Sequence, residues 1–199
     1  MLLRYDDLSG EADQHGAVPP PVFDVLKKWG CSHECCATPF NATLDSYCSP
    51  FLDTDSLFGS HGSFFAFEPR SGNWEINPPF TLTTDVVEAH IRKLLDAAED
   101  DGLPLCFTMI HAAAHGKTVR DGCCGRYVRR EFTLPPGGHY YREGKFWCKA
   151  NARAYVPPFP TIIIHLATTA AAAKWPFDAD LVTALRRAFA WPQAAASTG

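Results

Sequence analysis

Trp74-Glu75-Ile76-Asn77-Pro78-Pro79-Phe80 is the stretch that decides how this chain of 199 residues is arranged. Its first part, Trp74 to Ile76, is a short apolar run that predicts the end of a buried strand. The two prolines after Asn77 cannot donate hydrogen bonds to a strand ladder, so regular pairing stops there. The stretch therefore predicts a stiff loop at a strand end, carrying an amide side chain, exposed carbonyls and an aromatic ring.

This loop has the groups needed to hold the amino group of a flat base. The Oδ1 atom of Asn77 and the carbonyl of Pro78 can accept the two hydrogens of an exocyclic amine, while Phe80 stacks on the ring. Such a set suits the N6 amine of adenine beside a methyl donor. Because an Asn-Pro-Pro run is also common in ordinary turns, the interpretation depends on the strand before the loop and the helix after it.

Length and composition indicate one globular domain. The chain is 46% hydrophobic and 20% charged, and its length is enough to bury roughly 70% of the unfolded surface. No apolar run approaches the ~20 residues of a membrane span, and residues 1–16 lack the apolar core of a signal peptide. We expect an intracellular protein with no membrane partner. Its predicted parts are a polar segment at 1–18, a folded domain at 19–192 and a disordered tail at 193–199.

The eight cysteines are expected to be reduced thiols, because disulfide scaffolds are usually shorter and denser in cysteine. A zinc site is an alternative, although the spacing matches no ordinary zinc knuckle. Its residues would be Cys31, His33, Cys35 and Cys36. His111 and His115 are four residues apart, which serves a metal when both lie on a helix, and Gly116 argues against a helix there. We therefore predict no metal.

Helices and strands alternate along the chain, which predicts an α/β fold. The best-patterned helix covers 84–99, where apolar residues follow the helical repeat. The other predicted helices are 22–29, 42–48, 170–174 and a last one that Asp178 caps and that ends at Pro192. The predicted strands are 31–37, 63–67, the strand ending at 74–76, 103–110, 127–134 and 161–167. A long loop is expected at 49–62.

The turn after the first predicted strand is a candidate wall of a cofactor pocket. Its residues are Thr38, Pro39, Phe40 and Asn41. In an open α/β sheet, ligands bind beyond the carboxyl ends of the strands, near a topological switch point. Asn41 offers polar contacts and Phe40 a stacking face, and the alternative is a plain turn from strand to helix.

Charge is distributed unevenly along the chain. Residues 1–60 carry nine acids and three bases, whereas residues 117–153 carry nine bases and three acids. The second stretch is a candidate phosphate-binding face, with a solvated surface as the alternative. Residues 139–149 interleave aromatic and basic side chains, as single-strand nucleic-acid sites do, and a half-buried hairpin explains this equally well. The candidate RNA contacts are Arg129, Arg130, Arg142 and Lys149.

Four linked motifs occur in one order at compact spacing. They are Glu34-Cys35-Cys36-Ala37-Thr38-Pro39-Phe40-Asn41, Tyr47-Cys48-Ser49-Pro50-Phe51-Leu52-Asp53-Thr54-Asp55, Phe58-Gly59-Ser60, and the stretch from Ser71 to Phe80. Together they resemble the phosphorylated-CTD-interacting factor family, whose members are cap-specific adenosine N6-methyltransferases. The resemblance covers the catalytic core, from about Val22 to Phe189. It implies a Rossmann-like S-adenosylmethionine-dependent methyltransferase fold, a three-layer α/β/α sandwich.

The resemblance also implies a reaction and a set of site residues. The reaction is methyl transfer from S-adenosylmethionine to the N6 amine of the 2′-O-methyladenosine next to the mRNA cap. Asn77, Pro78, Pro79 and Phe80 match the catalytic motif, and the turn after the first strand matches the cofactor-side motif. Expected cofactor contacts are Thr38, Pro39, Phe40, Asn41 and Asn77. Expected substrate contacts are Pro78, Phe80 and the four basic residues given above.

The implied partners are capped mRNA and the phosphorylated tail of RNA polymerase II, with a nuclear or cytoplasmic location. Two departures from the family pattern leave the substrate open. The first carboxylate after the motif is Asp85, and residues 112–116 replace a loop that usually carries Trp and prolines. The alternatives are adenine N6-methylation of other RNA or of DNA, and a non-catalytic RNA- or protein-binding remnant of the fold.

Overall fold

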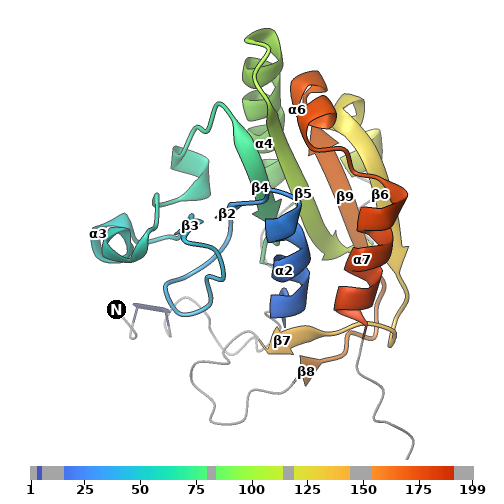
Figure 1. The fold of residues 1–199 in the computed structure, drawn as a ribbon. Helices are drawn as coiled ribbons and strands as arrows, with labels where there is room; N and C mark the ends of the chain where they lie inside the picture. The colour runs from blue at the N-terminus through green and yellow to red at the C-terminus, as the bar shows by residue number, and fades with distance from the viewer. Residues whose placement is uncertain (1–3, 6–15, 80–83, 114–118, 144–153, 191–199) are drawn as a thin grey trace, which may run out of the picture.

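The computed structural model describes residues 4–5, 16–79, 84–113, 119–143 and 154–190 (Figure 1). Its centre is a six-stranded sheet of order β3-β2-β4-β5-β9-β6. The strands are β2 (His33–Glu34), β3 (Ser46–Tyr47), β4 (Gly72–Ile76), β5 (Leu105–Ala112), β6 (Val128–Leu134) and β9 (Thr161–Ala167). The first four strands of this order are parallel to one another, whereas β9 is antiparallel to both β5 and β6.

The order of the strands creates a topological switch point. From β2 the chain goes to β3 on one side, and it then returns to β4 on the other side of β2. Ligands of open α/β sheets bind at such points, beyond the carboxyl ends of the strands. The predicted α/β fold with a Rossmann-like, mostly parallel sheet is therefore confirmed.

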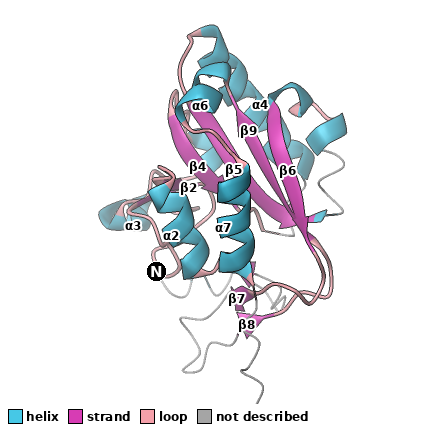
Figure 2. Cartoon of the chain, turned by 45° about the vertical axis from the view of Figure 1, so that its right-hand side comes forward, coloured by secondary structure: helices cyan, strands magenta, loops and turns pink. Residues whose placement is uncertain are grey.

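Helices cover both faces of the sheet, which gives three layers. Figure 2 shows α2 (Pro20–Lys28) and α7 (Ala179–Phe189) over one face, with α4 (Thr84–Asp100) on the other. Alternation along β5 explains this, because Leu105, Phe107 and Met109 belong to the core under α4, whereas Ile110 belongs to the core under α2 and α7. The short α6 (Thr169–Lys174) packs against β5 and β9.

The predicted helix boundaries rest on local chemistry that the structure bears out. Asp178 caps α7 by accepting a hydrogen bond from the backbone N–H of Leu181 at 2.9 Å. Prolines occupy the first turn of α2, and Gly30 follows this helix with φ +99°, where a Cβ would lie 2.7 Å from the Trp175 ring nitrogen. Glycine is therefore required at position 30.

Two predicted elements are wrong. Residues 63–67 form the 3₁₀-helix η2 (Phe64–Ala66) in place of a strand, because Phe64 alone of its three residues is buried. Residues 42–48 form no helix and include β3. The physical reason is that Ser46 and Tyr47 pair with His33 and Glu34 of β2, which requires an extended backbone.

Several predicted segments differ from the structure in extent. The first strand is shortened to β2, and the loop at 49–62 contains α3 (Leu52–Asp55) and the 3₁₀-turn η1 (Ser56–Phe58). A further 3₁₀-turn, η3 (Gly125–Tyr127), precedes β6. The tail at 193–199 and most of the segment at 1–18 lie outside the described residues.

A second sheet of three short strands was not predicted. It consists of β1 (Gly16–Ala17), β7 (Tyr141–Glu143) and β8 (Ala154–Tyr155), in the order β1-β7-β8 with antiparallel pairing. The sheet joins the beginning of the described chain to the segment between β6 and β9. Its position matters for the site described below.

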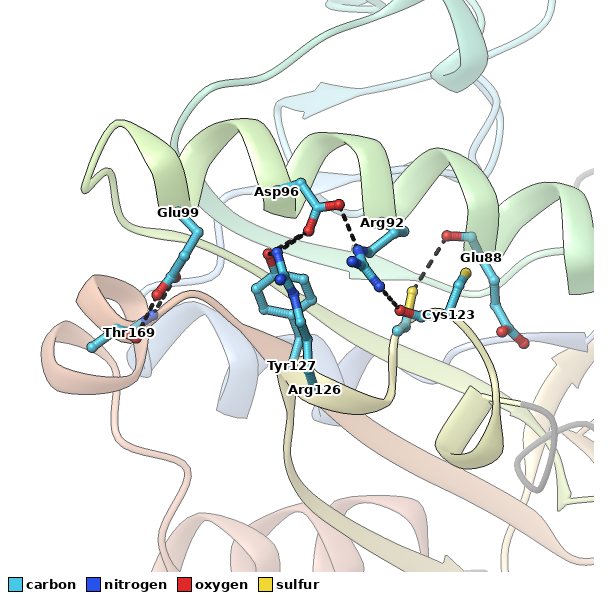
Figure 3. A network of polar contacts seen from close by, with 9 residues as sticks. Glu88, Arg92, Asp96, Glu99, Cys123, Arg126, Tyr127 and Thr169 are labelled. Carbon is cyan, nitrogen blue, oxygen red and sulfur yellow. Dashed lines mark hydrogen bonds and ion pairs between the residues drawn. The ribbon is translucent and has the colours of Figure 1, made fainter.

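A network of polar contacts ties α4 to the segment before β6 (Figure 3). Asp96 accepts hydrogen bonds from Arg92 (2.5 Å), from the Tyr127 hydroxyl (2.6 Å) and from Arg126. At the end of α4, Glu99 accepts from the backbone N–H of Thr169 at 2.7 Å and from its hydroxyl at 2.6 Å. These contacts fix β6 and α6 relative to α4.

Each cysteine that the structure describes is a free thiol. Within the described ranges, no group of three or more His, Cys, Asp or Glu residues is arranged to hold a metal ion, and His115 lies outside those ranges. Among the described helices, none is both long enough and apolar enough to cross a membrane.

Candidate active site

The two predicted motifs lie beyond the carboxyl ends of β2 and β4, at the switch point of the sheet. Strands β2 and β4 are parallel neighbours, with Glu34 opposite Glu75, and the N–H of Cys35 donates to the Glu75 carbonyl at 2.8 Å. The segments that follow these strands therefore leave the sheet next to each other. One leads to the turn at Thr38–Asn41, and the other is the loop at Asn77–Pro79.

The cofactor-side turn is closed by its own side chains. Asn41 Oδ1 accepts from the Thr38 backbone N–H at 2.6 Å and from its hydroxyl at 3.0 Å. The N–H of Phe40 donates to the Thr38 hydroxyl oxygen at 3.2 Å. Thr38, Phe40 and Asn41 remain half-buried. Asn41 Oδ1 thus stabilises the turn, and the Nδ2 group is the part of this side chain that can donate to a ligand.

Glu34 is a site residue that the sequence reasoning missed. Its carboxyl accepts the two backbone N–H groups of Thr43 and Leu44, and the side chain is only 4% exposed. Burial raises the pKa of Glu34 to about 7, although both hydrogen bonds act in the opposite direction. A carboxylate inside a predicted core strand was the available signal. Glu34 holds the connection from the cofactor-side turn to β3.

Asn77 begins the loop after β4, and a backbone carbonyl that is far away in the sequence orients its amide group. The Nδ2 group donates to the carbonyl of Gly16 at 2.8 Å. Oδ1 is consequently the end of the amide that can accept a hydrogen bond from a substrate. Pro78 is buried and Pro79 is exposed, while Phe80 lies outside the described residues.

A row of buried polar groups crosses the sheet beside this loop. Glu75, two residues before Asn77, is paired with Glu34 on one side and with Thr108 on the other, and Thr108 is paired with His165. All four residues are at most 4% exposed. Burial raises the pKa of Glu75 well above its usual value and lowers the pKa of His165 to about 3. His165 is therefore neutral at pH 7.

Three of the basic residues predicted to contact RNA are described, and the structure does not bring Arg129 and Arg130 together with Arg142. Arg129 and Arg130 lie on β6, at the opposite edge of the sheet from β3, and donate to the carbonyls of Ala167 (3.0 Å) and Phe177 (3.4 Å). Arg142 lies on β7 opposite Ala17. Ala17 directly follows Gly16, whose carbonyl accepts a hydrogen bond from Asn77. Lys149 lies outside the described residues.

Part of the basic stretch at 117–153 is committed to ion pairs within the chain. Arg120 pairs with Glu131 at 3.0 Å, and Arg126 pairs with Asp96. Of the predicted RNA contacts that the structure describes, Arg142 is the one that lies near the loop at Asn77.

Comparison with known proteins adds an independent line of argument. The family model described as "Phosphorylated CTD interacting factor 1 WW domain" matches residues 1–144. A Mus musculus protein named mRNA (2′-O-methyladenosine-N(6)-)-methyltransferase is 34% identical over 188 residues. A Homo sapiens protein of the same name is 32% identical over 188 residues. Each match covers 88% of this chain and 26% of the relative, so the chain spans about a quarter of the length of these curated relatives.

Proposed function

Because the chain belongs to the phosphorylated CTD interacting factor 1 family, we propose that it is an enzyme that methylates the N6 amine of adenosine in RNA. One observation carries the proposal. The turn at Thr38–Asn41 and the loop at Asn77–Pro79 follow neighbouring parallel strands at the switch point of the sheet. That is where ligands of this fold class bind, and the two segments hold the residues expected for cofactor and for base.

S-adenosylmethionine is the proposed cofactor, and it supplies a methyl group bonded to a positively charged sulfur. The turn fits such a ligand because its backbone is fixed by Asn41 and Thr38, while its residues remain partly exposed. Thr38, Pro39, Phe40 and Asn41 would line the cofactor on one side, and Asn77 would stand between the cofactor and the base.

Asn77 and Pro78 would act on the amine itself. The adenine amine is a poor nucleophile, because its lone pair is shared with the ring. Two acceptors, Asn77 Oδ1 and the Pro78 carbonyl, would draw the N–H hydrogens toward them and turn the nitrogen toward tetrahedral geometry. They would also stabilise the positive charge that develops on nitrogen. Phe80 would orient the ring, and the amine proton would leave to water afterwards.

The proposed substrate is the 2′-O-methyladenosine next to the cap of mRNA, which the names of both relatives specify for those proteins. Pro78, Phe80 and Arg142 would contact the RNA, with Arg129, Arg130 and Lys149 as further candidates. Binding to the phosphorylated polymerase tail is proposed from the family description alone. A nuclear location would follow from these partners.

The test has two stages. Purified protein is first titrated with S-adenosylmethionine by calorimetry. It is then incubated with the cofactor and a short RNA capped before 2′-O-methyladenosine, and methylated nucleosides are measured by mass spectrometry. The same RNA without a cap and a DNA oligonucleotide of the same sequence are the matched controls.

Each outcome has a distinct meaning. Cofactor binding with transfer to the capped adenosine supports the whole proposal. Equal transfer to uncapped RNA or to DNA overturns the cap preference and keeps adenine methylation. Cofactor binding without transfer to any adenosine points to a non-catalytic protein, and the absence of cofactor binding overturns the proposal.

A further inference from the structure

The loop that holds Asn77 contacts the small second sheet through a hydrogen bond to Gly16. Gly16 on β1 is 61 residues away from Asn77 in the sequence, yet its carbonyl accepts the Asn77 Nδ2 hydrogen at 2.8 Å. The position of that carbonyl is set by pairing with β7, where Gly16 lies opposite Glu143 and Ala17 opposite Arg142. The strand β1 therefore presents one backbone carbonyl to the loop after β4.

Position 16 has no room for a side chain. A Cβ on Gly16 would lie 2.9 Å from Cγ of Tyr141, closer than such atoms approach in proteins, and 3.0 Å from its Cβ, which is tighter than most contacts of a Cβ. These are the rigid inner atoms of the Tyr141 side chain, so rotation of the ring offers no relief. The absence of a side chain lets β1 come close enough to place its carbonyl against Asn77.

Tyr141 cannot move away from Gly16, because its hydroxyl is held by a hydrogen bond. The side chain is 0% exposed, and its hydroxyl is hydrogen-bonded to the Thr161 hydroxyl at 2.9 Å. Thr161 is in turn bonded to His139 Nε2 at 2.7 Å, and His139 Nδ1 is bonded to the Pro135 carbonyl at 2.8 Å. This series of hydrogen bonds from Pro135 to Tyr141 thus fixes the surface on which Gly16 rests.

We infer that Gly16 is a positioning residue of the active site, and that the pairing of β1 with β7 holds the Asn77 amide in the orientation that presents Oδ1 to the substrate amine. This inference rests on the proposed methyltransferase function for its kinetic consequences. A side-chain amide with no such partner can turn over, placing its NH₂ group where the acceptor is needed. An NH₂ group facing the amine would repel its hydrogens.

The test variant is Gly16→Ala, and Ser71→Ala is the control. Ser71 is an exposed residue just before β4, and the variant keeps its backbone carbonyl, which accepts from Trp74 Nε1 at 3.4 Å. With capped RNA, Gly16→Ala should lower kcat roughly tenfold, the upper range for one lost hydrogen bond. The affinity for S-adenosylmethionine should stay within about twofold, and Ser71→Ala should match the parent chain.

A double substitution separates positioning from a general loss of structure. If Gly16 acts through Asn77, adding Gly16→Ala to Asn77→Ala should change kcat less than twofold, roughly. An equal drop in both backgrounds would overturn the inference. So would a rise in kcat for Gly16→Ala, because it would show that β1 blocks the site.

A measurement without turnover keeps the inference testable if the methyltransferase proposal fails. The side-chain NH₂ resonance of Asn77 is identified by its disappearance in Asn77→Asp, and its hydrogen exchange is then followed by NMR. Exchange should be slow in the parent chain and in Ser71→Ala, and clearly faster in Gly16→Ala. Equal exchange in all three proteins would overturn the positioning role, whatever the activity.

Discussion

A side-chain amide has two chemically different ends, and in Asn77 the hydrogen bond to Gly16 determines which end remains as an acceptor. The role proposed for Asn77 was inferred from its neighbours in the sequence, the strand before it and the prolines after it, and it stays a prediction. The role of Gly16 could not be inferred in this way, because its partner is 61 residues away and the contact uses a backbone atom.

Asn77→Ala tests the acceptor directly. The variant should lower kcat by at least ~10²-fold, the scale of losing one preorganised polar contact in a transition state. Cofactor binding should change little. Ser71→Ala, an exposed position just before β4, is the control and should leave kcat unchanged. Near-full turnover by Asn77→Ala would mean that Asn77 is not the acceptor.

Glu34 offers a second test at the scale of one residue. Glu34→Ala would leave the buried N–H groups of Thr43 and Leu44 without their acceptor, and should lower the free energy of unfolding by at least about 2 kcal/mol. Glu34→Gln keeps an acceptor oxygen and should lose less than about 1 kcal/mol. Urea unfolding measures both values. Equal losses of unfolding free energy in the two variants would show that these hydrogen bonds do not contribute to stability.

Elements with many residues of one pattern were predicted correctly, whereas two short predicted elements, at 42–48 and 63–67, were wrong. The strand at 161–167 and the helix α4 have long apolar patterns that survive any tertiary context. The run at 63–67 is too short to separate a strand from a turn of 3₁₀-helix. The region at 42–48 was predicted wrongly because Ser46 and Tyr47 pair with β2, a contact with another element that a local pattern does not contain.

The cap of α7 is testable at the scale of an element. Asp178→Ala removes the side-chain acceptor for the Leu181 N–H and should lower the free energy of unfolding by about 1 kcal/mol. Asp180→Ala changes an exposed acid in the same first turn, where the helix dipole is the main effect, and should cost less. A larger loss for Asp180→Ala in thermal unfolding would argue against the cap.

The whole molecule should respond to pH through its buried carboxyls. Because burial raises the pKa values of Glu34 and Glu75 in the folded state, the folded chain keeps protons that the unfolded chain has lost. Stability from these groups is present at low pH and decreases as pH rises from about 4.5 through the folded pKa values. His165 has the opposite effect below about pH 6.5, since its folded pKa is lowered to about 3.

The free energy of unfolding should therefore decrease between about pH 6.5 and 7, where His165 no longer opposes the carboxyls and the folded chain still keeps the Glu34 proton. Glu75→Gln removes one of the responsible groups, so its stability should depend less steeply on pH in that range. Asp180→Ala, at an exposed acid on α7, should keep the slope of the parent chain. Urea unfolding at several pH values measures the slopes, and identical slopes for Glu75→Gln and the parent would contradict the assignment to Glu75.

The position of β9 has a consequence for the order of events during synthesis. This strand is the last of the sheet to be made, yet it lies between β5 and β6. Until residues 161–167 leave the ribosome, β6 has no neighbour in the central sheet, and one long edge of β5 stays open. The nascent chain must keep β5 and β6 apart until β9 can pair between them. During this time the open strand edges are prone to aggregation, and they are covered only when synthesis has passed residue 167.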